Sequence, residues 1–246
     1  IVLTVMAGRP LCIREDIDRA DAVLYAFHGG TMQGTALANL IMGKVAPSGR
    51  LPMTFPMGEG QIPFYYNYKT PSRLMAKSPK LINDIPIRAY QFSVGESSYW
   101  LEYGNKPEYP FGYGLTYTTF EYGPVVLSDT CLNASSPDHL VASCEIANTG
   151  NRDAVAVPQL YIRDVVGSLT RPIRELKGFQ RVEIPAGETR TVTFELTEED
   201  LAYWHLSEGA SLGSAGQYAF SAEKGDFHVW IAPNAEEGEY AEFTLK

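Results

Sequence analysis

The chain has 246 residues, of which 45% are hydrophobic, and a net charge of −9 with a pI near 5.0. This apolar content is enough for packed cores and excludes a disordered chain. The acidic charge and the lack of a Lys/Arg cluster argue against nucleic acid and against an anionic membrane surface as partners. The longest apolar runs are far shorter than the roughly 20 residues of a membrane helix.

The N-terminal run Ile1–Val5 reads like an internal strand, without an initiator Met or a signal-peptide pattern, which predicts a piece of a longer protein. The three cysteines are Cys12, Cys131 and Cys144, and they show no CxxC or Cys/His spacing. We therefore expect neither a metal site nor a cofactor. Cys131 and Cys144 flank a short polar stretch, so both a disulfide and two free thiols fit the sequence.

The first segment, residues 1–68, has the pattern of an α/β domain. Ile1–Met6 and Asp21–Phe27 are short apolar runs that predict parallel strands, and Arg14–Ala20 predicts a short helix or turn between them. Met32–Met42 has apolar residues at helical spacing. Thr31 is its expected N-cap, and Gly43 is its expected stop.

A glycine turn, His28–Thr31, connects the second strand to this helix. A ligand can bind at such a turn, because the amides of the helix N-terminus converge there. The spacing is not that of a dinucleotide site, which also needs an acidic partner further along the chain. His28 fits a structural histidine best, with a catalytic base or a sugar contact as the alternative.

Residues 69–114 read as an irregular aromatic loop followed by an inter-domain linker. A loop of this length is typically functional or disordered, and its aromatic residues argue against disorder. Tyr99 and Trp100 fit either plain packing or contacts with the C–H faces of sugars. The aromatic stretch Pro110–Phe120 is interpreted as a packed hinge rather than a solvated linker.

Residues 115–246 change to a period of two. Apolar side chains alternate with polar ones over His139–Asn148, Thr191–Leu196 and Asp226–Ala232, and turn sequences separate these runs. About seven short strands predict a β-sandwich of immunoglobulin-like shape. Pro158 within Val155–Ile162 predicts an edge strand or a bulge, and Thr197–Trp204 predicts a capped helical turn.

Charged residues gather in sequence after the middle of this segment. They are Asp164, Arg171, Arg174, Glu175 and Lys177. A solvated loop with ion pairs explains them better than a binding patch. No triad, metal cluster or defensible carboxylate pair is visible, although glycosidases need two carboxylates about 5–10 Å apart.

Several stretches, taken in order, resemble the C-terminal third of glycoside hydrolase family 3 enzymes of the β-glucosidase and β-xylosidase kind. They are His28–Ala36, Pro47–Pro56, Gly60–Pro63, Tyr109–Tyr117, Asn148–Gly150, Pro158–Tyr161, Arg171–Pro172 and Glu175–Phe179. Each one alone is a weak signal, but their order and spacing over nearly the whole chain are specific.

The resemblance implies the C-terminal portion of an α/β sandwich domain over residues 1–68, followed by a fibronectin III-like β-sandwich over residues 115–246. It also implies a missing N-terminal TIM-like barrel that carries the aspartate nucleophile of a retaining enzyme. In many members the acid/base glutamate lies upstream of the position of Ile1. We therefore expect no catalytic residue in this chain, and β-linked oligosaccharides as the substrate.

Two departures from the family pattern define the expected substrate contacts. At the turn the family has a glutamate, whereas this chain reads Gly29-Gly30-Thr31-Met32-Gln33, so Gln33 is the candidate sugar contact there. The insertion Lys69–Lys106 is longer and more irregular than expected for the family. Such a loop can reach over a barrel mouth, which makes Tyr99 and Trp100 the other candidates.

Two functions remain open. The first is an accessory part of a secreted or periplasmic β-glycosidase, inactive by itself, with a β-glucosidase favoured. The second is a stand-alone fibronectin-like module that binds carbohydrate or a partner.

Overall fold

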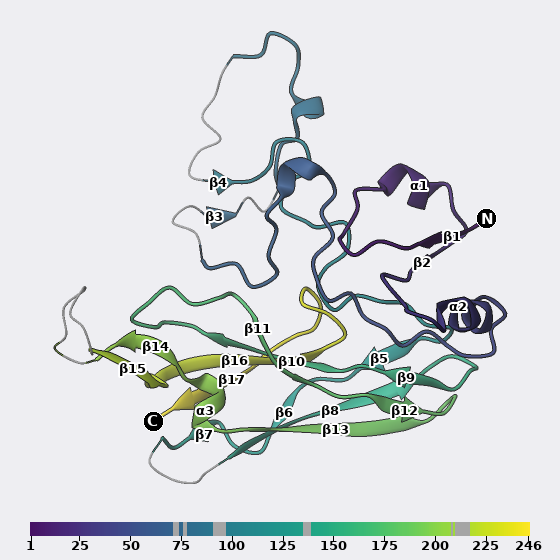
Figure 1. Cartoon of the computed structure of the whole chain (residues 1–246). Coiled ribbons are helices and arrows are strands. Elements are labelled where there is room, and N and C mark those ends of the chain that lie inside the picture. The colour runs from purple at the N-terminus through teal and green to yellow at the C-terminus, as the bar shows by residue number, and fades with distance from the viewer. Residues whose placement is uncertain (71–73, 76–77, 91–96, 135–138, 208, 210–216) are drawn as a thin grey trace. The chain divides into compact units, whose positions relative to one another are not determined.

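The computed structural model describes residues 1–70, 74–75, 78–90, 97–134, 139–207, 209 and 217–246. Its internal contacts divide the chain into two units (Figure 1). Unit 1 comprises Ile1–Tyr66 and Thr70–Gly114, and unit 2 comprises Asn67–Lys69 and Leu115–Lys246. Residues 70–114 thus group with unit 1. In the described part of the chain, no helix is both long and apolar enough to cross a membrane.

Unit 1 begins with a parallel pair of strands, as the sequence predicts. β1 (Val2–Val5) pairs with β2 (Ala22–Tyr25), and α1 (Arg14–Asp18) lies in the connection between them. α2 (Gln33–Ile41) follows β2 after the glycine turn, which confirms the predicted helix within a residue at each end.

The caps of α2 are only partly as expected. Gly43 has a φ of 67°, a left-handed conformation that suits glycine and stops the helix as predicted. At the other end the N-cap is Met32, without a side-chain capping bond, so the assignment of Thr31 as N-cap is wrong.

The rest of unit 1 has little regular structure. Its short elements are η1 (Glu59–Gln61), β3 (Leu74–Met75), η2 (Ile82–Asp84) and β4 (Ser97–Ser98). The buried side chain of Gln61 connects two segments of unit 1, one around Met57 and the other around Lys106. Its Oε1 accepts a hydrogen bond from the Met57 N–H at 2.7 Å, and its Nε2 donates to the Lys106 carbonyl at 3.1 Å.

Aromatic side chains supply the packing of unit 1. Tyr25 lies edge-on to Phe55, with ring centroids 4.8 Å apart, and Tyr109 stacks on Tyr113 at 5.0 Å. Two residues of the predicted hinge, Phe111 and Tyr113, therefore pack inside this unit, because Phe111 also stacks on Tyr66 at 4.2 Å.

Unit 2 is a β-sandwich, as predicted. One sheet has the order β11-β10-β16-β17-β7, with the bounds Glu175–Phe179, Gln159–Asp164, Gly225–Ala232, Ala241–Leu245 and Cys131–Leu132. The other has the order β13-β8-β5, with β6 also paired to β8, and the bounds Thr189–Leu196, Leu140–Asn148, Phe120–Tyr122 and Val126–Leu127. Their inward-facing aliphatic and aromatic side chains form one core.

Two further strand pairs and a short helix complete the sandwich. β9 (Ala154–Ala156) pairs with β12 (Val182–Ile184), and β14 (Tyr203–Leu206) pairs with β15 (Tyr218–Ser221). α3 (Glu198–Leu201) starts at Thr197 with a capping box to Asp200, which confirms the predicted helical turn.

For Val155–Ile162 the sequence predicts an edge strand or a bulge, and a register shift between Leu160 and Tyr161 in the pairing of β10 with β11 fits the bulge. The structure divides this run at Pro158 into β9 and β10, and β10 lies inside its sheet between β11 and β16. Proline has no N–H for a sheet ladder, so it fits the break between two strands. Cys131 and Cys144 are both free thiols.

The fold class agrees with the prediction: an α/β portion is followed by an all-β sandwich.

Candidate functional site

The turn between β2 and α2 positions the first candidate residue, Gln33. The Gly29 N–H donates to Gln33 Oε1 at 3.2 Å. A Cβ on Gly29 would lie only 2.7 Å from the Cγ of Gln33, so only glycine leaves room for this arrangement. The Nε2 atom of Gln33 is buried and forms no hydrogen bond to the described residues. The side chain is thus fixed at one end and keeps a free donor at the other.

His28 is exposed and lies against Gly8. A Cβ on Gly8 would approach its Nε2 atom to 2.8 Å, so the ring covers the backbone of the Ala7–Pro10 turn. This contact fits the structural interpretation of His28.

Tyr99 and Trp100 directly follow β4, and both are half-buried. The Trp100 ring packs on Phe64 with centroids 5.0 Å apart. The Trp100 carbonyl accepts a hydrogen bond from the Gly104 N–H at 2.7 Å, which closes a turn. Packing within unit 1 therefore accounts for part of the Trp100 surface.

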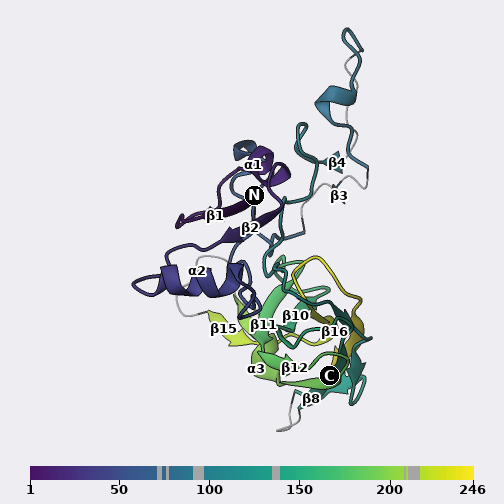
Figure 2. The same ribbon diagram turned by 90° about the vertical axis from the view of Figure 1, so that its right-hand side faces the viewer.

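The three candidate substrate contacts are not gathered at one place in unit 1. Figures 1 and 2 show β4, next to Tyr99 and Trp100, well separated from α2, which begins at Gln33. Unit 1 alone therefore does not form a single sugar pocket from these residues.

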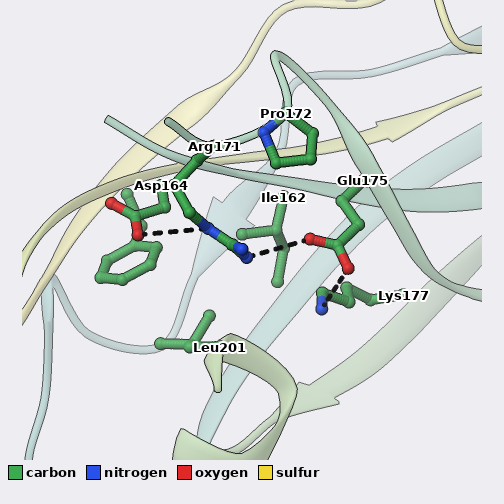
Figure 3. A pocket seen from close by; sticks show the side chains of 8 residues that line it. Ile162, Asp164, Arg171, Pro172, Glu175, Lys177 and Leu201 are labelled. Carbon is green, nitrogen blue, oxygen red and sulfur yellow. Dashed lines mark hydrogen bonds and ion pairs between the residues drawn. The ribbon is translucent and has the colours of Figure 1, made fainter. Parts of the chain in front are cut away.

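Unit 2 gathers four of the five charged residues that are close in sequence (Figure 3). Arg171 Nη2 lies 3.2 Å from Glu175 Oε2, and Arg171 Nε lies 3.6 Å from Asp164 Oδ2. Lys177 Nζ lies 3.0 Å from Glu175 Oε1. The ion pairs are as expected, but the cluster is not solvated, because the Asp164 and Arg171 side chains are 5% and 16% exposed.

Arg174, the fifth residue, points elsewhere. It donates to the Ala235 and Glu237 carbonyls, both at 2.8 Å, and its guanidinium lies 4.4 Å from the centroid of the Trp230 ring.

The ion-pair cluster extends to residues far away in the sequence. The Arg171 guanidinium lies over the Tyr203 ring at 3.8 Å, and the Tyr203 hydroxyl donates to Glu223. The Ser168 N–H also donates to Glu223, at 2.7 Å, and His205 Nδ1 lies 3.7 Å from the other carboxylate oxygen.

The charges of the cluster are paired with one another and have a structural role. Burial raises the pKa of Asp164, and the neighbouring Arg171 only partly opposes this effect. The cavity among Asp164, Arg171, Glu175 and Lys177 has a volume of about 10 Å³. That volume suits roughly one water molecule. This space leaves no room for a sugar ring between the carboxylates.

Sequence reasoning missed Tyr203 and Glu223 as members of this cluster. It also missed the outward face of β16, which carries Asp226 and His228. The alternation at the start of Asp226–Ala232 already places these two side chains on the face of the strand opposite to its apolar side chains. This alternation was the sequence signal from which the outward face could have been predicted. For Tyr203 and Glu223 no local signal exists, because only the fold brings them to Arg171.

Comparison with known protein families gives two matches. Residues 1–117 match the glycosyl hydrolase family 3 C-terminal domain, and residues 156–235 match a fibronectin type III-like domain.

Individual proteins match over both units. The chain is 35% identical over 245 residues to a periplasmic β-glucosidase of Salmonella typhimurium, covering 100% of this chain and 29% of that protein. It is 32% identical to a putative β-xylosidase of Formosa agariphila, covering 100% of this chain and 28% of that protein. The chain thus spans less than a third of the length of these relatives.

A solved structure is similar as well. The β-glucosidase from Listeria innocua in complex with isofagomine superposes with a TM-score of 0.81 at 33% identity, covering 99% of this chain and 31% of that one.

Proposed function

The chain belongs to glycoside hydrolase family 3, whose C-terminal region it represents, and from this premise we propose that it is part of a retaining β-glycosidase. The reaction is hydrolysis of terminal β-linked sugars from oligosaccharides, and a β-glucosidase is favoured over a β-xylosidase. The observation that carries the proposal is the continuous match to β-glucosidases over both units, in sequence and in backbone.

The catalytic carboxylates belong, in this proposal, to an N-terminal TIM-like barrel outside the chain. The matched relatives are more than three times longer than the region they share with this chain, which leaves room for such a domain. Within the chain, the carboxylates of Asp164 and Glu175 are already ion-paired to Arg171 and enclose space for about one water only.

Unit 1 is proposed to shape the rim of the substrate cleft. Gln33, whose Nε2 atom is covered in this structure and has no partner among the described residues, would turn outward to donate to a sugar hydroxyl, and Tyr99 and Trp100 would present ring surface to a sugar face. Because these residues lie apart within unit 1, each would contact a different part of a cleft completed by the barrel. A secreted or periplasmic location follows the S. typhimurium relative, which is named as periplasmic.

A stand-alone binding module explains unit 1 less well. Apolar side chains of this unit are exposed on β1 and at its end, and at both ends of α2, namely Val2 (48%), Met6 (65%), Met32 (66%) and Met42 (73%). Exposed apolar surface of this extent is typical of a face that another domain covers.

Hydrolysis of a panel of aryl β-glycosides tests the proposal. The 27.2 kDa chain, checked by intact mass, should give no turnover, and the protein extended by its barrel should hydrolyse the β-glucoside. Turnover by the chain alone would contradict the assignment of the carboxylates to the barrel. An extended protein that cleaves no β-glycoside would contradict the proposed function itself.

A further inference from the structure

A cleft of about 560 Å³ opens on unit 2, on the outward side of β16, β17 and the β7 edge. Its volume is in the range of small-molecule sites. The side chains of Phe227, Val229 and Phe243 point from the same strands into the core, so the residues that alternate with them face outward.

The strand register places polar groups side by side on this face. Asp226 lies opposite Thr244, and His228 lies opposite Glu242. Thr244 Oγ1 donates to Asp226 Oδ1 at 2.8 Å, and His228 Nε2 lies 3.4 Å from Glu242 Oε1. A carboxylate offers about four acceptor positions, so each of these carboxylates keeps capacity for hydroxyl donors.

An aromatic ring stands next to the cleft, outside its lining, and contacts it through His228. Tyr240 is 49% exposed and stacks on the imidazole of His228 at 4.0 Å and 7° between the planes. Trp230 contacts both rings edge-on, so the imidazole and the phenol are held in fixed orientations. Burial lowers the pKa of His228, against the raising influence of Glu242, so the imidazole is neutral near pH 7 and can donate to or accept from a hydroxyl.

We propose that this cleft binds a segment of a neutral β-linked oligosaccharide. The carboxylates of Asp226 and Glu242 accept hydrogen bonds from sugar hydroxyls in the cleft. The Tyr240 ring, beside the cleft, covers a C–H face of a sugar that extends past His228. The cleft lining has two carboxylates, Asp226 and Glu242, against one ammonium, Lys246, and this negative balance disfavours acidic sugars. Lys246, which also lines the cleft, disfavours a small cation. The choice of a sugar as the ligand rests on the proposed function. The presence of the cleft is observed in the structure and does not depend on that function.

Calorimetric titration of the chain with a thio-linked β-gluco-oligosaccharide tests this site. The thio linkage resists hydrolysis, so binding is measured whether or not the protein extended by its barrel is an enzyme. The unmodified chain should bind this probe, and a uronic-acid oligosaccharide should not bind. The isosteric double variant Asp226→Asn/Glu242→Gln should lower the affinity by about tenfold, because it removes two charged acceptors.

Matched variants separate binding from folding. Glu195→Gln changes an exposed carboxylate on β13 of the other sheet and should leave the affinity unchanged. Tyr240→Ala should weaken binding, and Tyr240→Phe, which keeps the ring, should not. Failure of the unmodified chain to bind, or equal affinity of the double variant, would overturn the proposal. A binding signal in a titration with calcium, together with none in the titration with the sugar, would also overturn the proposal.

If the sugar binds the chain but the protein extended by its barrel hydrolyses no aryl glycoside, the proposed function fails and this site stands. If hydrolysis occurs and the sugar does not bind the chain, the site fails alone.

Discussion

Arg171 is the residue that neutralises the charged interior of unit 2. It contacts Asp164 and Glu175, and its guanidinium also covers the Tyr203 ring. An ion pair this well buried contributes little by itself, because desolvation offsets the attraction between the charges. Removal of one partner is costly, since it leaves the other charge buried alone.

Arg171→Met should therefore lower the free energy of unfolding by about 3 kcal/mol, since Asp164 would lose its counter-charge. Urea unfolding of the chain at neutral pH measures this change. The matched control is Arg190→Met, whose pair with Glu188 is exposed (46% and 48%). That change should cost about 0.5 kcal/mol or less.

A second variant tests the electrostatic cause. Adding Asp164→Leu to Arg171→Met should recover a large part of the lost stability, because no unpaired buried charge remains. If the double variant is as unstable as the single one, lost packing rather than charge explains the effect.

At the scale of elements, Glu223 ties the β14–β15 hairpin to the loop after β10. It accepts hydrogen bonds from the Ser168 N–H in that loop and from the Tyr203 hydroxyl on β14. Burial tends to raise the pKa of Glu223, but these hydrogen bonds and nearby His205 outweigh it and lower the pKa below 4.5. The sequence contained each residue of this link but not their proximity.

Because the pKa of Glu223 is lowered by folding, its ionised form stabilises the fold above pH 4.5, and this contribution is lost as the pH falls through the folded pKa. Tyr203→Phe removes one donor and should cost about 1.5 kcal/mol at neutral pH. The difference from the unmodified chain should shrink as the pH falls below 4.5.

Urea midpoints between about pH 7 and about pH 3 measure this difference. Asp164 titrates in the opposite sense, since its pKa is raised, and it is present in both proteins, so it largely cancels. Tyr218→Phe, on the exposed face of the same hairpin, is the control and should show no such pH dependence. A Tyr203→Phe effect that is constant over the whole pH range would exclude the link to Glu223.

The elements themselves were predictable where burial repeats along the chain. β8, β13 and the first half of β16 alternate between core-facing and outward side chains, and the apolar residues of α2 recur at helical spacing. The sequence therefore located these four elements within about two residues. The division of Val155–Ile162 into two strands at Pro158 was not predicted, because a run of apolar residues does not reveal that its two ends belong to different pairings.

The cleft and the ion-pair cluster were less accessible from the sequence. The β7 edge of the cleft results from parallel pairing of Cys131 with Thr244, more than a hundred residues further along. Such pairings depend on which sheet edge remains open after the other strands have paired, and no local pattern encodes that.

At the scale of the whole molecule, burial is distributed unequally between the two units. Among the described residues, Phe55 (3% exposed) is the one buried hydrophobic side chain of unit 1, whereas unit 2 buries hydrophobic residues along both of its sheets. Hydrophobic burial is the main favourable term in folding, so unit 2 should be the more stable of the two.

Limited proteolysis of the chain at low protease concentration should therefore cut first within unit 1 and leave a protected fragment that starts near Leu115. Local opening of unit 1 needs little loss of buried apolar surface, whereas cleavage inside the sandwich requires its core to open. Mass spectrometry of the fragments over time identifies the order of the cuts.

In the protein extended by its barrel, the same digestion should leave unit 1 uncut, if the proposed barrel covers the exposed apolar side chains of this unit. Early cuts within β8, β13 or β16 would contradict the assignment of unit 2 as the stable core, and unchanged cutting of unit 1 in the longer protein would show that the barrel does not cover it.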